Sequence, residues 1–237
     1  MSAVNAAKLT AILKKHQSAP MPEPPRTEGR DPLAVLVHAF LLWENLPTPS
    51  LDVYQKLVSA TVDLNDLRIS LPQELVSFMG VRFPRAAERA QRLRATLNDI
   101  YRREHAVSLA GLSASAKRDA RSYIESLEGI VPFVASRTLL LCYSVHGVPV
   151  DDLLRDRLAE AGVCEPGMDA NELSNVLSRQ IKAEHAESAH AALLAFVEGS
   201  GGGKSSSRGG RSAAKSEAKA EKGTSRRGKS SRSTSRS

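Results

Sequence analysis

The sequence has few cysteines, few aromatic residues and no long hydrophobic run. Two cysteines among 237 residues, Cys142 and Cys164, are too few for a disulfide framework or a four-cysteine iron–sulfur cluster. We therefore expect a reduced, intracellular protein without such a cofactor. Apolar runs are only a handful of residues long, and the N-terminus lacks an apolar core followed by a cleavage site. Neither membrane spanning nor export is predicted.

Positive charge is concentrated at one end of the chain. Residues 199–237 hold 11 of the 33 Lys and Arg residues but only 2 of the 26 acidic ones, a net of +9, which leaves −2 for residues 1–198. The stretch has almost no apolar residues, so we predict a disordered tail. Its charge would bind a polyanion through counterion release. A solubility appendage and a phosphorylation target are the alternatives.

The rest of the chain favours an all-α fold in three parts. Residues 1–17 suit a short amphipathic helix, and residues 18–31, with four prolines, suit a linker or a strap across the surface. Residues 32–198 form the main helical domain, and no segment alternates long enough to predict a sheet. Within it, Leu33 to Asn45 is apolar on nearly every side, which predicts a central buried helix with His38 as a hydrogen-bonded core residue.

A later helix, from about Pro84 to His105, carries Arg85, Arg89 and Arg92 on one face. Glu88 stands four residues before Arg92 and can pair with it, so a solvated face is the first interpretation of these arginines. Contact with phosphate is the alternative.

The stretch from Tyr123 to Leu158 predicts a helix, a tight hairpin and a second helix. Gly129 suits the left-handed end of the first helix, and Pro132 suits the first turn of the next. The free N–H groups and dipole at the start of the second helix form a site for a nucleic-acid phosphate. The candidate DNA-binding residues are Gly129, Ile130, Val131 and Phe133 of the hairpin, with Lys117, Arg118 and Arg121 of the preceding helix.

These residues resemble a known family. Leu127-Glu128-Gly129-Ile130-Val131, then His146-Gly147, Pro149, Val150-Asp151 and Gly162, are similar to the helix–hairpin–helix and catalytic-aspartate region of the endonuclease III superfamily of DNA glycosylases. The resemblance implies a helical bundle in two lobes and a role for Asp151 as the catalytic carboxylate. A carboxylate there stabilises the positive charge that develops on the sugar, or orients the attacking water.

The departures from the family pattern narrow the expected chemistry. Val131 replaces the second hairpin glycine, and Phe133 stands where bifunctional members carry the Schiff-base lysine. A phenyl ring cannot form an imine, so AP-lyase activity is not expected. Asp151-Asp152-Leu153 replaces Asp-Thr-His, and the C-terminal cysteine cluster is missing, so no iron–sulfur cluster or other metal is expected.

The resemblance implies a DNA-binding protein of the base-excision-repair type, a monofunctional N-glycosylase that uses Asp151. A catalytically inactive DNA-binding protein and a helical interaction scaffold are the alternatives, since an Asp before a leucine-rich helix is also a standard N-cap. DNA would be held mainly by its backbone, through the hairpin and the tail. No obligate protein partner is evident, and we expect a cytoplasmic or nucleoid-associated protein.

Overall fold

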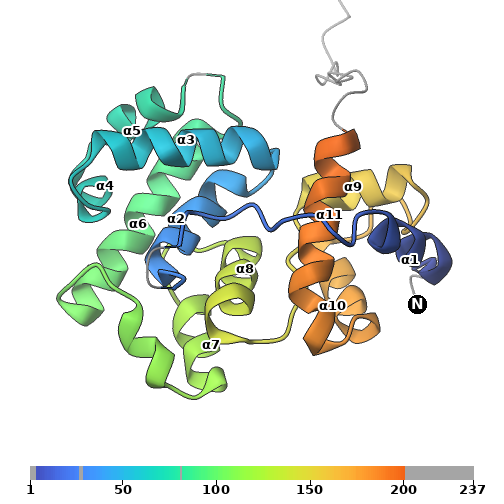
Figure 1. Ribbon diagram of the computed structural model, residues 1–237. Coiled ribbons are helices and arrows are strands. Elements are labelled where there is room, and N and C mark those ends of the chain that lie inside the picture. The colour runs from blue at the N-terminus through green and yellow to red at the C-terminus, as the bar shows by residue number, and fades with distance from the viewer. Residues whose placement is uncertain (1–3, 27–28, 81, 201–237) are drawn as a thin grey trace, which may run out of the picture. The chain divides into compact units, whose positions relative to one another are not determined.

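A computed structural model describes residues 4–26, 29–80 and 82–200, and over these residues every regular element is a helix (Figure 1). The predicted all-α fold is confirmed. No helix within these ranges is long and apolar enough to cross a membrane. The helices are α1 (Ala6–Lys15), α2 (Pro32–Leu42), α3 (Pro47–Ala60), α4 (Asn65–Ile69), α5 (Pro72–Met79), α6 (Ala86–Glu104), η1 (Ala110–Ala114), α7 (Lys117–Glu125), α8 (Pro132–Tyr143), α9 (Asp152–Glu160), α10 (Ala170–Gln180), η2 (Ala183–His185) and α11 (Ala186–Ser200).

Helix α2 is the centre of the first lobe. Its N-cap Asp31 accepts a hydrogen bond from the N–H of Leu33 at 3.0 Å, and every residue from Leu33 to Leu42 is buried. It packs against α3, α6 and α8, which gives this lobe one continuous hydrophobic core. The prediction for His38 was only half right. The ring is buried against Tyr54, yet neither ring nitrogen has a hydrogen-bond partner among the described residues, and burial lowers its pKa to about 3.

Helix α3 begins at Pro47, because a proline is well suited to a first helical position. On the short helix α5, Phe78 is 38% exposed. One predicted boundary differs from the structure. Gly199 and Ser200 complete the last turn of α11 and are not part of the tail. Residues 201–237, the remainder of that predicted tail, lie outside the described residues.

The second lobe is built from the first helix of the chain, α1, and the last helices, α9 to α11. Helix α1 packs on α11, and the N–H of Asn5 donates to the carbonyl of Val163 at 2.7 Å. Apolar residues of α1, α9, α10 and α11 form a second core. Helix α11 serves both lobes, since Leu193 belongs to this core and Leu194 to the first.

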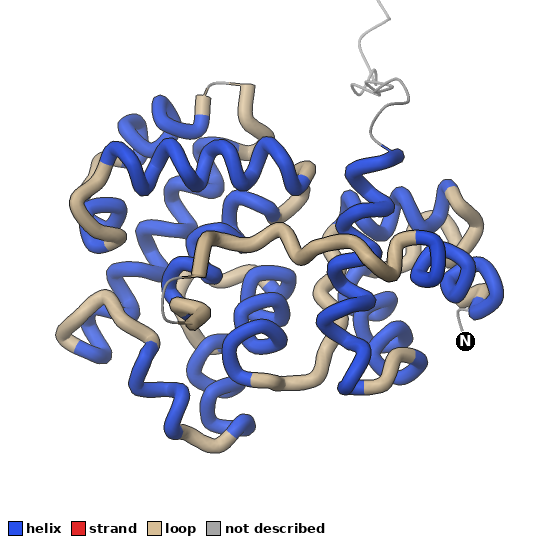
Figure 2. Tube along the Cα trace, viewed as in Figure 1, coloured by secondary structure: helices blue, strands red, loops and turns tan. Residues whose placement is uncertain are grey.

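Residues 19–26, part of the segment predicted to be a linker or a strap, run from the second lobe towards the first as a loop (Figure 2). Arg30 pairs with Glu23 of the strap and with Glu187 of α11. The fully buried Arg137 of α8 donates to the carbonyl of Pro22 and lies 2.6 Å from Nε2 of His190. Because a guanidinium only donates, that ring nitrogen must be the unprotonated acceptor. The strap is therefore fastened to both lobes.

Candidate nucleic-acid interface and the Asp151 site

The predicted helix–hairpin–helix is present, formed by α7, the turn 126–131 and α8. Gly129 has φ +78°, the left-handed conformation expected of it. The hairpin also lies tightly on α6, because a Cβ atom at Gly129 would be 2.7 Å from the carbonyl oxygen of Arg92. Close approach to α6 and the sharp turn both require a glycine here.

Two side chains of α6 hold the hairpin backbone. Oδ2 of Asp99 accepts from the N–H of Glu128 at 2.9 Å, and Oγ1 of Thr96 donates to the carbonyl of the same residue at 2.8 Å. Burial raises the pKa of Asp99, but this N–H and the guanidinium of Arg103 outweigh it, so the pKa lies below its usual value. Asp99 is thus a charged anchor under the turn, and α6 fixes where the hairpin sits.

The start of α8 keeps its hydrogen-bond donors free. Val131 is the N-cap, with no side-chain acceptor of its own, and Pro132 has no N–H. Within the described residues, the N–H groups of Val131, Phe133 and Val134 meet no carbonyl or side-chain oxygen. Free donors of this kind, together with the helix dipole, attract an anion.

The side chains of the predicted hairpin contacts do not all reach the surface. Val131 and Phe133 are 6% and 3% exposed, and the Phe133 ring lies edge-on to the His190 ring at 6.2 Å. These two residues offer a ligand only their backbone N–H groups. Gly129 and Ile130 line the turn itself, and Ile130 is half-buried.

The three basic candidates lie on α7 and are exposed. Lys117 Nζ donates to the carbonyl of Ser144 at 2.8 Å, and Arg121 donates to the carbonyl of His146 at 3.2 Å. Both cations therefore also hold the segment that leads from α8 to Asp151. Arg118 makes no such bond within the described residues.

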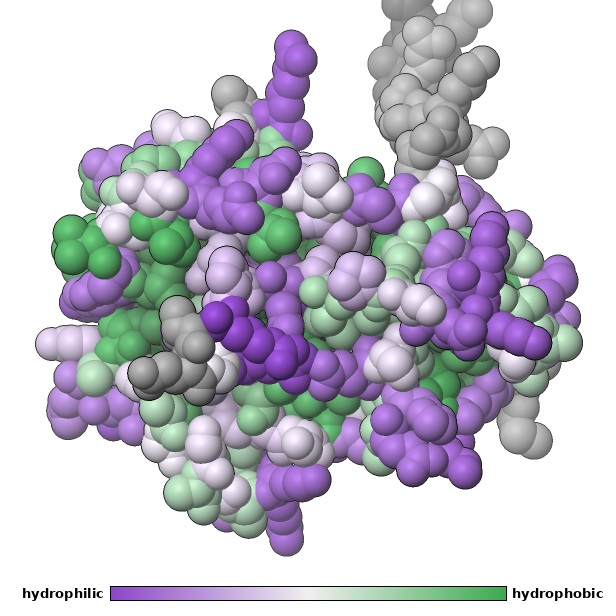
Figure 3. Space-filling view, in the orientation of Figure 1, coloured by the Kyte–Doolittle hydropathy of each residue, from purple (hydrophilic) through white to green (hydrophobic). Residues whose placement is uncertain are grey.

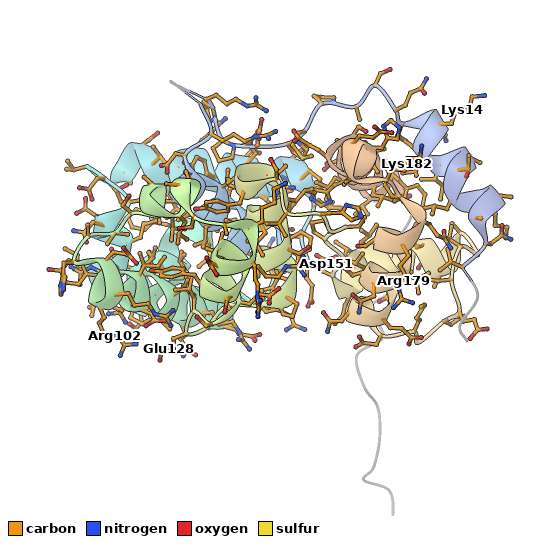
Figure 4. All side chains as sticks on the ribbon, turned by 90° about the horizontal axis from the view of Figure 1, so that it is seen from below. Lys14, Arg102, Glu128, Asp151, Arg179 and Lys182 are labelled. Carbon is orange, nitrogen blue, oxygen red and sulfur yellow. The ribbon has the colours of Figure 1, made fainter. Side chains whose placement is uncertain are left out.

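Asp151 lies between the two lobes and is almost fully buried, at 7% exposure (Figure 4). Its Oδ1 accepts from the N–H of Leu154 at 2.9 Å, which makes it the N-cap of α9. Its Oδ2 accepts from the N–H of Glu44, just beyond the end of α2, at 2.6 Å. Burial raises the pKa of Asp151, and the backbone donors only partly offset this. The Asp151 carboxylate thus caps a helix of the second lobe and accepts a hydrogen bond from the backbone of the first lobe.

Glu44, which sequence reasoning did not single out, completes this contact. Its backbone is left-handed, with φ +51°, a conformation that is strained for a residue with a side chain. Its carboxylate pairs with Arg85 at 2.9 Å, and burial raises its pKa. Trp43, with ψ 118°, leaves helical geometry, so the N–H of Glu44 turns away from the α2 carbonyls and reaches Asp151. Since 107 residues separate the two, no local pattern could have paired them.

The interpretation of the α6 arginines as one solvated face was wrong for Arg89. This side chain is fully buried, and it donates to the carbonyls of Phe40 and Pro84. The carbonyl of Phe40 lies in the last turn of α2 and lacks an amide partner, because the N–H of Glu44 is given to Asp151. Arg89 supplies the missing donor, and burial lowers its pKa to about 10. Arg85 and Arg92 remain at the surface, paired with Glu88.

Beside the hairpin lies a groove with a volume of about 680 Å³, which we call the hairpin groove. Its walls are the turn from Ile130 to Pro132, one face of α8, and the face of α10 that carries Asn175 and Arg179. Asp151 does not line it. The hairpin groove therefore reaches Val150 but not the buried carboxylate of Asp151.

No protein-family model matches the sequence, and no curated protein matches it. Solved structures do. A trapped endonuclease III–DNA covalent intermediate is 15% identical with a TM-score of 0.62, over 80% of this chain and 83% of that one. A thermostable thymine-DNA glycosylase is 14% identical with a TM-score of 0.56, over 81% and 84%.

The Clostridium acetobutylicum 8-oxoguanine glycosylase/lyase, in complex with DNA, is 14% identical with a TM-score of 0.59, over 83% and 67% of the chains. The chain has the fold of the helix–hairpin–helix DNA glycosylases. The similarity extends over both lobes, well beyond the hairpin region that carried the resemblance in sequence. At this identity it establishes the fold, and the chemistry depends on the residues described above.

Proposed function

We propose that this protein binds DNA through its helix–hairpin–helix, with a phosphate held at the start of α8. The observation that carries the proposal is the pair of free N–H groups of Val131 and Phe133, which lie beside a turn that two side chains of α6 hold in place. An N-terminal helix turn with free donors is a general site for phosphate. The fold is shared with proteins whose structures contain DNA.

The proposal also covers the role of the basic tail and the location of the protein. The lysines and arginines of residues 201–237 add non-specific affinity for the DNA backbone through counterion release. Because the partner is DNA, the protein acts inside the cell. No iron–sulfur cluster takes part, since a chain with two cysteines cannot supply four thiolate ligands.

In this proposal Asp151 is a structural group. Both of its oxygens already accept backbone hydrogen bonds, and the side chain is almost entirely buried. A carboxylate that stabilises a sugar cation must face that sugar, and the hairpin groove does not reach it. Asp151 would then hold the lobes in the arrangement that binds DNA, and no base would be released.

A monofunctional N-glycosylase is the second candidate. It is favoured by the place of Asp151 between two lobes, at the start of α9, and by the raised pKa that burial gives this carboxyl. Catalysis would require the Glu44 N–H to leave Oδ2, so that the carboxylate faces an extruded nucleotide. Phe133 cannot form an imine, so a lyase step has no part in this candidate either.

Two measurements separate these functions. Fluorescence anisotropy with labelled duplex DNA at low salt tests binding, and loss of all binding would support a protein scaffold instead. A glycosylase assay on duplexes with a panel of damaged bases tests catalysis, with Asp151→Asn as the comparison. Base release by the natural protein but not by the variant would establish the second candidate. Binding without base release would establish the first.

A further inference from the structure

The hairpin groove combines an apolar floor with polar groups that the fold does not use. Leu139, Val145 and Val150 contribute to the floor. On the α10 wall, Asn175 and Arg179 are exposed, and neither side chain makes a hydrogen bond or ion pair within the described residues. By contrast, Ser174 and Ser178 on the same wall are bound to the backbone of Val148. The free groups are therefore the ones at the groove's open edge.

The charges around the groove favour an anion. Glu125 is the one acidic residue that lines it, and the guanidinium of Arg121 lies 3.9 Å from that carboxylate. With this pair neutralised, Arg179 leaves one net positive charge on the opposite wall. Pro132, at the start of α8, lines the groove as well, so the positive end of the helix dipole opens into it.

We infer that the hairpin groove carries the continuation of the DNA strand whose phosphate lies at the start of α8. The inference rests on the proposed DNA binding. Phosphodiester oxygens of that strand would accept hydrogen bonds from Arg179 and from the amide of Asn175. These contacts read no sequence, since they reach only the backbone. The groove lining has no Phe, Trp or Tyr, so bases do not stack in it.

An acidic protein segment is the rival occupant, and the surroundings of the groove favour DNA. The donors of α8 and the cation of α10 lie on two sides of one groove, as a continuous polyanion requires. A DNA strand carries a phosphate at every nucleotide, so it can offer the same chemical group to the α8 donors and to Arg179.

The first test measures the salt dependence of DNA binding with the full-length chain. Arg179→Ala should lower the slope of log Kd against log salt by about 1, the effect of losing one phosphate contact, and should weaken binding equally for unrelated duplex sequences. The matched control is Lys182→Ala, which removes one positive charge three residues after Arg179. The Lys182 side chain is 80% exposed and does not line the groove. It should leave the slope unchanged.

The second test is cross-linking. Asn175→Cys should form a disulfide with DNA whose phosphate backbone carries a tether ending in an activated disulfide, because the cysteine thiolate displaces the capping thiol, whereas Lys182→Cys should not. Equal yields from the two cysteines would overturn the inference, as would an unchanged slope for Arg179→Ala when the natural protein binds DNA. Absence of DNA binding by the natural protein would refute the proposed function itself. If binding of a labelled poly-glutamate peptide depended on Arg179 and binding of DNA did not, the groove would be assigned to an acidic protein segment.

Discussion

Replacement of Asp151 by alanine tests whether this carboxylate holds the two lobes together. Loss of the N-cap bond to Leu154 destabilises a helix by about 1 kcal/mol. The N–H of Glu44 would also lose its acceptor at a partly buried interface, which costs about 1–3 kcal/mol. Removal of a desolvated carboxylate, whose pKa burial raises, offsets part of this loss. We expect a net destabilisation of about 2 kcal/mol.

The assay is thermal unfolding followed by circular dichroism. For a domain of this size, about 2 kcal/mol lowers Tm by about 4–8 °C. The matched control is Asp152→Ala, one residue later in the first turn of α9, where the side chain is half exposed and pairs with Arg155 at 2.6 Å. An exposed ion pair contributes under about 1 kcal/mol, so the control should change Tm by less than about 4 °C. Equal Tm values for the two variants would refute the interlobe role of Asp151.

Three further predictions follow from single sites. Burial raises the pKa of Asp151, so the folded protein holds this proton more tightly than the unfolded chain. The natural protein should therefore lose stability relative to Asp151→Asn as pH rises from about 4 through the folded pKa. A Tm difference between the two proteins that is independent of pH would contradict this. Gly129→Ala should destabilise by about 2 kcal/mol, from the left-handed φ and the contact with Arg92, and should weaken DNA binding, as chemical denaturation and anisotropy would show. Arg89→Ala should destabilise by about 3 kcal/mol in the same denaturation assay, since it leaves a cavity and two carbonyls without donors, while the exposed Arg85→Ala should stay within about 1 kcal/mol; similar losses from both would show that burial of Arg89 is unimportant.

The exposed apolar residues of the first lobe are not explained by the DNA-binding proposal. Val62, Ile69 and Leu71 are more than half exposed, and Figure 3 shows hydrophobic surface on the side of the lobe where α4 lies. The cores of both lobes are filled without them. They therefore contribute little to the stability of the domain.

Much of this protein was determined by its sequence alone. The unbroken apolar pattern of α2 and the Asp31-Pro32 start specify a buried helix, because capping and helical periodicity act over a few residues. Gly129 and Pro132 specify the hairpin for the same reason, since each fixes its own backbone torsion. Phe133 excludes imine chemistry whatever the fold.

Only the tertiary structure decided what the charged residues do. In sequence Arg89 looks like Arg85 and Arg92, yet it is buried where the end of α2 offers the carbonyl of Phe40, which needs a donor. Asp151 fits both a cap and a catalyst in sequence, and the N–H of Glu44, brought from another lobe, takes its second oxygen. Such partners lie far apart in the chain. Whether a charged side chain is buried, and what it bonds to, depends on which helices pack together. That information is absent from any local pattern.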